Sequence, residues 1–169
     1  QFLGAYDLEK NLEISKKMVL SANLLWTHAK GNIEKLRHLN FPRPEEFIVN
    51  YRGLDLSPLS ELKTIWSDRQ YDFITVSRLI EGKGIMECLR AALELKKKGK
   101  EFKYVIVGEG PLHKECSSFI HEHKLTDFIS LLGYQPIDKV YELMGSSRYF
   151  VLLSEKVGEC LPNVIKEAM

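Results

Sequence analysis

Four short, nearly continuous apolar runs recur in the last hundred residues of this chain, and a helical pattern follows each of them. The runs YDFITVS, FKYVIVG, FISLLG and RYFVLLS begin at Tyr71, Phe102, Phe128 and Arg148. Short runs rich in apolar and β-branched residues are typical of strands that are buried on both faces. Strands that alternate with helices predict an α/β fold, in which a parallel sheet carries helices on both faces.

The segments between these runs have helical features. Ile85, Leu89 and Ala92 fall on one helical stripe, and Gly99 follows as a C-cap. Pro111 suits the first turn of the next helix. The predicted helices span residues 84–98, 112–123 and 137–145, and a fourth opens at Pro162.

The loops that follow the four runs are expected on one edge of the sheet. Ligands of such sheets bind at the carboxyl ends of the strands. The four loops are SRLIEGKG, GEGP, GYQP and SEKVGECLP. We therefore expect these four segments to converge on one crevice.

The first 70 residues follow a less regular pattern. We expect a helix over 9–17, a short strand over 18–23, a helix over 24–39 that is broken near Gly31, and a strand over 45–51. The stretch RGLDLSPLSEL then has the Gly, Pro and Ser content of a linker. A domain boundary is therefore predicted between Asn50 and Leu62.

Charge, hydropathy and cysteine content exclude several classes of protein. The formal net charge is +1 with mixed signs, so no nucleic-acid-binding footprint is present. No apolar run reaches the roughly 18 residues of a membrane span, and no signal peptide opens the sequence. Cys88, Cys116 and Cys160 are widely spaced, which argues against a disulfide framework or zinc site and fits a reducing cytosol.

Two cations lie in the loop after the first regular strand. Arg78 and Lys83 are five residues apart, and such a pair at the rim of a sheet can clamp a diphosphate. The alternative is a solvated loop in which Glu81 pairs with either cation. Spacing alone does not decide between the two interpretations.

The stretch GEGP after the second regular strand contains half of a dinucleotide-binding fingerprint. Gly108 and Gly110 are present, but His113 occupies the place of the third glycine, so a nicotinamide site is not indicated. The two glycines suit either a close backbone approach to a ligand or a plain turn.

Two glutamates flank the start of the last predicted helix. Glu159 precedes Pro162, and Glu167 lies about one and a half turns into the helix. Free N–H groups at a helix start favour phosphate, whereas carboxylates accept hydrogen bonds from sugar hydroxyls. A nucleotide-sugar satisfies both, and two solvated charges are the alternative. The chain has no Asp-x-Asp pair, which commonly holds a metal against a sugar diphosphate.

Five motifs in order resemble the retaining glycosyltransferases of family 4, whose GT-B fold has two facing Rossmann-like domains. The resemblance runs from about Glu45 to Met169 and ends on the E-x7-E signature, with Glu159 and Glu167 as its glutamates. The motifs are IVNYRGLDLSPL, VSRLIEGKGI, VIVGEGPL, LLGYQP and SEKVGECLPNVIKEAM.

This resemblance implies a role for each matching residue. Arg78 and Lys83 match the pair that neutralises the donor diphosphate, and Glu159 matches a catalytic-site glutamate that orients the donor sugar. Glu167 matches the glutamate that binds the nucleotide ribose. The remaining donor-binding positions are Gly108 and Gln135, which line the base pocket, and Asn163 and Val164, whose backbone meets the phosphates.

Three residues depart from the family pattern. Ser77 stands where the family often has Gly, and Arg52 stands where it usually has Asn. Cys160 replaces a frequent Gly after the first glutamate, which is expected to narrow or redirect the sugar pocket. No proposed ligand residue is lost.

The resemblance also implies the domain organisation. Residues 1–50 correspond to the end of an N-terminal, Rossmann-like acceptor domain, and residues 51–61 to an interdomain linker. Residues 62–169 correspond to the nucleotide-sugar-binding donor domain, incomplete at its C-terminus.

The function implied is a retaining hexosyltransferase of cell-surface polysaccharide biosynthesis. It would move a sugar from a UDP- or GDP-linked donor to a glycan or lipid-linked acceptor hydroxyl, without a metal or other cofactor. A cytoplasmic location follows, and peripheral contact with the inner membrane face through the acceptor domain stays open. The alternatives are a nucleotide-sugar epimerase of the same fold and a noncatalytic glycosyltransferase-like subunit.

Overall fold

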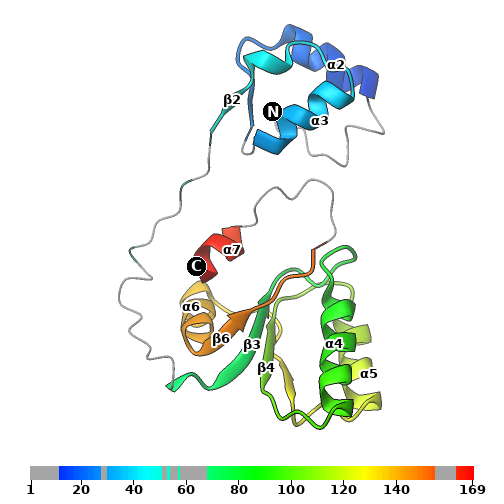
Figure 1. Cartoon of the computed structure of the whole chain (residues 1–169), viewed down its shortest axis with the longest axis vertical. Coiled ribbons are helices and arrows are strands. Elements are labelled where there is room, and N and C mark those ends of the chain that lie inside the picture. The colour runs from blue at the N-terminus through cyan, green and yellow to red at the C-terminus, as the bar shows by residue number, and fades with distance from the viewer. Residues whose placement is uncertain (1–11, 28–29, 51–52, 54–56, 58–67, 155–162) are drawn as a thin grey trace. The chain divides into compact units, whose positions relative to one another are not determined.

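The computed structural model describes residues 12–27, 30–50, 53, 57, 68–154 and 163–169 (Figure 1). The chain divides into two compact units, the first built mainly from residues up to Leu54 and the second from Asp55 onward. The predicted linker falls largely outside the described residues, so the proposed domain assignment stays a prediction.

The second unit contains a four-stranded parallel sheet with the order β5-β4-β3-β6. Every neighbouring pair is parallel, with Phe73 opposite Tyr104 and Tyr149 in the two ladders of the central strand β3. The elements are β3 Tyr71–Val76, α4 Ile85–Lys97, β4 Tyr104–Val107, α5 His113–Glu122, β5 Ile129–Leu131, α6 Ile137–Gly145, β6 Ser147–Phe150 and α7 Asn163–Ala168.

Helices cover both faces of this sheet, as the apolar runs predict (Figure 1). Successive residues of a strand point to opposite faces, so neighbouring residues of β4 enter different cores. Tyr104 and Ile106 pack with the buried residues of α4 and α5, whereas Val105 and Val107 pack with Val140 of α6. The all-buried pattern of β4 therefore follows from helices on each side.

The strands and helices predicted from Tyr71 onward are confirmed in type and order. Ile85, Leu89 and Ala92 are buried along α4, and Gly99 follows that helix with φ +67°. The fourth strand covers Ser147–Phe150 and is therefore shorter than the predicted strand over residues 148–154. Its ladder with β3 ends with the pair of Ile74 and Phe150.

The strand order reverses direction beside β3. The chain adds β4 and β5 on one side of β3 and then crosses to place β6 on the other side. At such a switch point the two following loops leave the sheet in opposite directions, which opens a crevice at the carboxyl ends. The loops that border this switch point begin after Val76 and after Phe150.

The first unit has a smaller core. Its two strands are two residues long and parallel, with Trp26 opposite Ile48. Val19, Leu25, Leu36 and Phe41 form the buried apolar cluster. The elements are α2 Leu12–Ser21, β1 Trp26–Thr27, α3 Lys30–His38, a 3-10 turn Pro44–Glu46 and β2 Ile48–Val49.

Several expectations for this unit are wrong. Residues 18–21 of the predicted 18–23 strand continue helix α2, because Ser15 and Val19 bury the same helical face one turn apart. The helix expected over 24–39 is instead strand β1 followed by α3, and Gly31 lies inside α3. The strand expected over 45–51 shrinks to Ile48–Val49.

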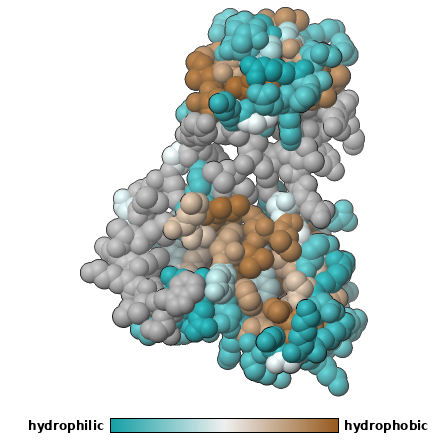
Figure 2. All heavy atoms as spheres, in the orientation of Figure 1, coloured by the Kyte–Doolittle hydropathy of each residue, from teal (hydrophilic) through white to brown (hydrophobic). Residues whose placement is uncertain are grey.

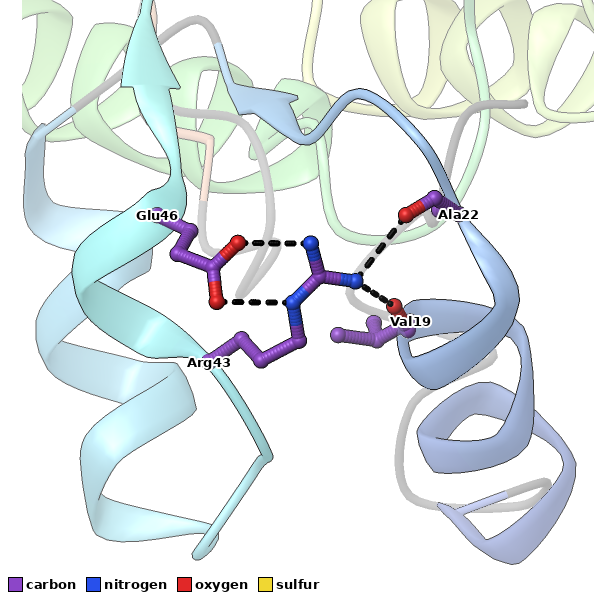
Figure 3. A network of polar contacts seen from close by, with 4 residues as sticks. All are labelled: Val19, Ala22, Arg43 and Glu46. Carbon is purple, nitrogen blue, oxygen red and sulfur yellow. Dashed lines mark hydrogen bonds and ion pairs between the residues drawn. The ribbon is translucent and has the colours of Figure 1, made fainter.

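A polar network joins the end of α2 to the 3-10 turn (Figure 3). Arg43 donates from Nη1 to the Val19 and Ala22 carbonyls, at 3.1 and 2.9 Å. Its Nε and Nη2 donate to the Glu46 carboxylate at 2.8 and 2.6 Å, and this hydrogen bonding lowers the pKa of Glu46. Arg43 thereby supplies donors to one carbonyl in the last turn of α2 and to one just after it, where helix carbonyls lack the partner four residues ahead.

Exposed apolar side chains are present in both units. Trp26 and Ile48 share one face of the two-stranded sheet and are 44% and 57% exposed. In Figure 2, hydrophobic side chains of the second unit gather around the end of β6, where Leu153 is exposed. None of the helices in the described ranges has the length and apolar character that crossing a membrane requires.

Candidate functional site

The loops that leave the carboxyl ends of β3, β4 and β5 are joined by backbone hydrogen bonds. Leu79 N donates to the Glu109 carbonyl at 2.8 Å, and Leu112 N donates back to the Leu79 carbonyl at 3.0 Å. Gly108 N donates to the Gly133 carbonyl at 2.8 Å. The convergence expected for these three loops is therefore observed at one edge of the sheet.

The segment after β6 joins the same edge. Val151 N donates to the Ile74 carbonyl at 2.8 Å, and Ser154 Oγ donates to the Gly82 carbonyl at 3.1 Å. A Cβ at Gly84, where φ is +70°, would overlap the Leu153 carbonyl. The loop after β3 thus packs on residues 151–154, and we call these four residues the β6 exit.

Gly108 is required by this packing. Its φ is +140°, and a Cβ there would overlap the Ser77 carbonyl. Only glycine combines this backbone conformation with so close an approach. The close approach observed at Gly108 is to the neighbouring loop, so an approach of GEGP to a ligand stays a prediction.

The two predicted cations both lie in the loop between β3 and α4, beside the switch point, but their environments differ. Arg78 is exposed, and its guanidinium has no ion pair among the described residues. Lys83 is only 6% exposed and sits between Gly82 and Gly84, the two residues that meet the β6 exit. The loop therefore presents one accessible cation and one that is held within it.

The predicted base-pocket residues lie on adjacent loops. Gly108 follows β4, and Gln135 follows β5. Gln135 Nε2 donates to the Leu132 carbonyl at 2.9 Å, which leaves its Oε1 atom available as an acceptor. The hydrogen bond between Gly108 and Gly133 brings these two loops together.

The remaining predicted residues follow β6 in the chain. Asn163 opens helix α7 and is exposed, Val164 follows it, and Glu167 lies one turn further on and is half-buried. Glu159 lies outside the described residues. The predicted division of a nucleotide-sugar between the cations and these residues stays a prediction.

Sequence reasoning missed an acidic residue at this edge. Glu109, between Gly108 and Gly110, accepts a hydrogen bond from the Tyr134 backbone N–H at 3.3 Å. The Tyr134 side chain beside it is 74% exposed. The sequence could have indicated this residue. Two glycines at the end of a buried strand predict a tight turn, and an acidic side chain between them is expected to project from that turn.

The buried thiols of the second unit are not candidate nucleophiles. Burial raises the pKa of the Cys116 thiol to about 11 and raises the pKa of Cys88 as well. A nucleophilic cysteine reacts as the thiolate, which these environments disfavour. Cys116 instead contacts Met86 of α4, with 3.8 Å between the sulfur atoms.

Comparison with known proteins relates the second unit to a known family. Residues 61–169 match the family model described as glycosyl transferases group 1. This match covers all four strands of the sheet and the loops on its carboxyl edge.

Two curated relatives are 30% identical to the chain. One is the N-acetylgalactosamine-N,N'-diacetylbacillosaminyl-diphospho-undecaprenol 4-alpha-N-acetylgalactosaminyltransferase of Campylobacter jejuni, over 150 residues, 88% of this chain and 39% of that protein. The other is the amylovoran biosynthesis glycosyltransferase of Erwinia amylovora, over 162 residues, 90% of this chain and 37% of that protein. The chain thus spans somewhat more than a third of these relatives.

A solved structure shares the fold. The chain resembles the Anabaena protein HepE, which was crystallised with UDP and glucose, with a TM-score of 0.75 and 20% identity. The match covers 95% of this chain and 45% of that one. This likeness supports the α/β fold with a parallel sheet that the sequence predicts.

Proposed function

The chain belongs to the glycosyl transferases of group 1, and we propose that it binds the donor in a retaining transferase. The enzyme moves a sugar from a nucleotide-diphosphate donor to an acceptor hydroxyl. The donor is a UDP- or GDP-linked sugar, and the acceptor is a glycan or a lipid-linked saccharide.

One observation carries this proposal: the loop with Arg78 and Lys83 borders the switch point between β3 and β6. Ligands of open parallel sheets bind at such points. Arg78 is exposed there, and no carboxylate of the described residues neutralises it. A dianionic diphosphate matches the charge that this loop presents.

The chemistry assigned to the two cations is stabilisation of the leaving group. When the bond from the sugar to the diphosphate breaks, negative charge grows on the departing phosphate. Arg78 offers its planar fork to the phosphate oxygens, and Lys83 adds a charge that the loop holds in place. Groups positioned in advance need no rearrangement as the charge develops, and they supply this stabilisation without a metal.

The glutamates are assigned to the hydroxyl-bearing parts of the donor. Glu167 accepts from the ribose hydroxyls, and Glu159 orients the donor sugar. Asn163 and Val164 meet the phosphates through backbone N–H groups, while Gly108 and Gln135 line the base pocket. Attack comes from the face that the diphosphate leaves, so the anomeric configuration is retained.

The relatives support the proposed substrate classes. The Campylobacter jejuni relative is named for a diphospho-undecaprenol saccharide, and the HepE structure contains UDP and glucose. We extend the same classes to this chain, with a cytoplasmic enzyme that meets lipid-linked acceptors at the inner membrane face.

The test is calorimetric titration of the full-length protein with a panel of UDP- and GDP-sugars, followed by turnover assays. Candidate glycan and lipid-linked acceptors are supplied with the donor that binds. We expect one donor to bind, sugar transfer to require an added acceptor, and NMR of the product to show the donor's anomeric configuration.

Other outcomes contradict the proposal in distinct ways. Conversion of the donor without an acceptor would indicate an epimerase. Donor binding without turnover on any acceptor would indicate a noncatalytic subunit. An inverted product would rule out the retaining mechanism while leaving the donor site intact.

A further inference from the structure

A buried polar group interrupts the apolar core of the second unit. Thr75 lies in the central strand β3 with no exposed surface. Its Oγ1 atom is 2.6 Å from the Tyr104 hydroxyl of β4 and 2.6 Å from the carbonyl of Val151, in the β6 exit. A hydroxyl here joins three neighbouring elements of the sheet.

The direction of these hydrogen bonds follows from their chemistry. The Val151 carbonyl can only accept, so Thr75 must give it its single proton. Thr75 Oγ1 then accepts from Tyr104, whose pKa burial raises well above its usual value. Tyr104 therefore stays a protonated donor at physiological pH, and the chain of hydrogen bonds runs from Tyr104 through Thr75 to Val151.

A third side chain belongs to the same cluster. The Cys88 thiol of α4 lies beside Tyr104, Thr75 and the backbone of Leu153, and burial raises its pKa. Thr75 thus contacts the backbone of the β6 exit directly, with the thiol next to it. Partnered polar groups in a core fix one arrangement, because each loses its partner if the backbone moves.

The location explains why polar side chains are needed here. The ladder between β3 and β6 ends with Ile74 opposite Phe150, and Val151 N adds one bond beyond it. The Val151 carbonyl is the next acceptor along the exit, and a carbonyl that is partly shielded from water gains from a donor within the protein. Thr75 supplies that donor from its side chain and so sets the direction in which the chain leaves β6.

The β6 exit in turn contacts the loop of the two cations. Ser154 Oγ donates to the Gly82 carbonyl, and Gly84 packs against the Leu153 carbonyl. Lys83 lies between these two contacts. A shift of the exit is therefore passed to the Lys83 backbone through its two neighbours.

We propose that Thr75, supported by Tyr104, is a positioning residue that aligns the Lys83 loop for the donor diphosphate. It acts through the β6 exit and touches neither donor nor acceptor. The proposal rests on the donor-binding function proposed above.

The test is Thr75→Val in the full-length protein, since valine keeps the shape and removes the hydroxyl. A misplacement of about 1 Å can cost on the order of 10²-fold in catalytic efficiency. We expect the donor KM and the Kd for the free nucleoside diphosphate to rise about tenfold or more, with the acceptor KM unchanged. Thr75→Ser keeps the hydroxyl and should restore most of the donor affinity.

A matched control separates positioning from stability. Ser147 is also buried, and its hydroxyl donates to the Leu143 carbonyl at 2.7 Å, at the opposite end of the sheet. Ser147→Ala should lower the unfolding free energy but leave the donor KM unchanged. Hydrogen exchange of residues 151–154 should accelerate in Thr75→Val and stay unchanged in Ser147→Ala.

If Thr75→Val does not fold, Tyr104→Phe carries the test, because it removes the support for Thr75 and keeps the ring. We expect a smaller rise in the donor KM, about threefold.

A normal donor KM in whichever variant folds would overturn the inference while the wild type still binds donor. If the wild type itself binds no nucleotide-sugar, the proposed function has failed instead, and hydrogen exchange of residues 151–154 still decides whether Thr75 orders the exit.

Discussion

The two ends of the four-stranded sheet are held together by different kinds of contact. At the carboxyl end, Gly84 and Gly108 let backbones approach so closely that a Cβ would overlap a neighbouring carbonyl. At the amino end, the Phe73 ring packs against Phe102 and Tyr149, with centroids 6.2 and 6.0 Å apart. One end is assembled from main chain and the other from large side chains.

The side chains at the amino end mainly stabilise the fold, whereas the backbone contacts at the carboxyl end mainly fix the positions of the loops. Aromatic packing stabilises a core through buried area and tolerates changes of similar volume. Loops joined by backbone hydrogen bonds bury little apolar area, but they hold their peptide groups and the Lys83 loop in one arrangement. We therefore expect changes at the carboxyl end to alter activity, and comparable changes at the amino end to alter stability alone.

The largest expected effect is on catalysis. Arg78→Ala should lower kcat/KM by about 10²–10³, the scale for one group that stabilises developing charge. Arg148→Ala is the matched control, because this arginine is also exposed but pairs with Asp72 at 2.9 Å near the amino end. Steady-state kinetics of both variants check the prediction, and equal losses would break the distinction between the two ends.

The next effect is on folding, and it compares two glycines with positive φ. Gly108→Ala should lower the unfolding free energy by about 3 kcal/mol, from backbone strain together with overlap on the Ser77 carbonyl. Gly99 has φ +67°, but a Cβ added there would meet nothing within 4 Å, so Gly99→Ala should cost only about 1 kcal/mol. Urea unfolding of both variants measures the difference, and similar values would show that close approach adds nothing.

A third prediction concerns the core between the two ends of the sheet, where the buried Cys116 thiol makes the stability depend on pH. The pKa of Cys116 is about 11 in the fold, above its usual value near 9, so the folded state binds the proton more tightly than the unfolded state. The associated stability is complete below pH 9 and is lost as the pH rises through 11. It amounts to roughly 2 kcal/mol.

The measurement is unfolding free energy at about pH 8 and pH 11 for the wild type and Cys116→Ala. The alanine variant should lose less stability over this interval, because it has no thiol to titrate at position 116. Parallel losses in the two proteins would contradict the prediction.

The smallest effect is expected at the amino end. Phe73→Leu keeps an apolar side chain but removes ring contacts with Phe102 and Tyr104. We expect a loss of about 1 kcal/mol in unfolding free energy. The kcat/KM of the folded fraction should be unchanged, and a donor-specific defect would show that the aromatic end also shapes the site.

The strands and helices of the second unit are predictable because their apolar patterns extend over many residues. The run YDFITVS and the stripe of Ile85 and Leu89 each extend over a whole element, so period and burial agree. In the first unit, β1 and β2 have two residues each, too few to show any period. The strand prediction from Met18 is wrong because burial in this segment depends on Leu36 and Phe41, which lie far along the chain.

The sequence predicts which loops form the candidate site, but it does not predict the contacts between those loops. Parallel strands bring their following loops to one edge, so the order of the motifs alone groups Arg78, Gly108 and Gln135. The overlap that excludes a Cβ at Gly84 depends on the path of Leu153, which no local pattern encodes. Thr75 has no sequence signal either, because threonine is common in strands and only the partner of its hydroxyl distinguishes it.

The strand order also has a kinetic consequence. β4 reaches its place beside β3 after one helix, whereas β6 reaches the other side only after three helices and two further strands. Closing the longer loop costs more chain entropy, and the chain emerges from the ribosome in order. We therefore expect β3, β4 and β5 to associate during synthesis while one flank of β3 stays uncovered, so that the carboxyl edge of the sheet is completed last.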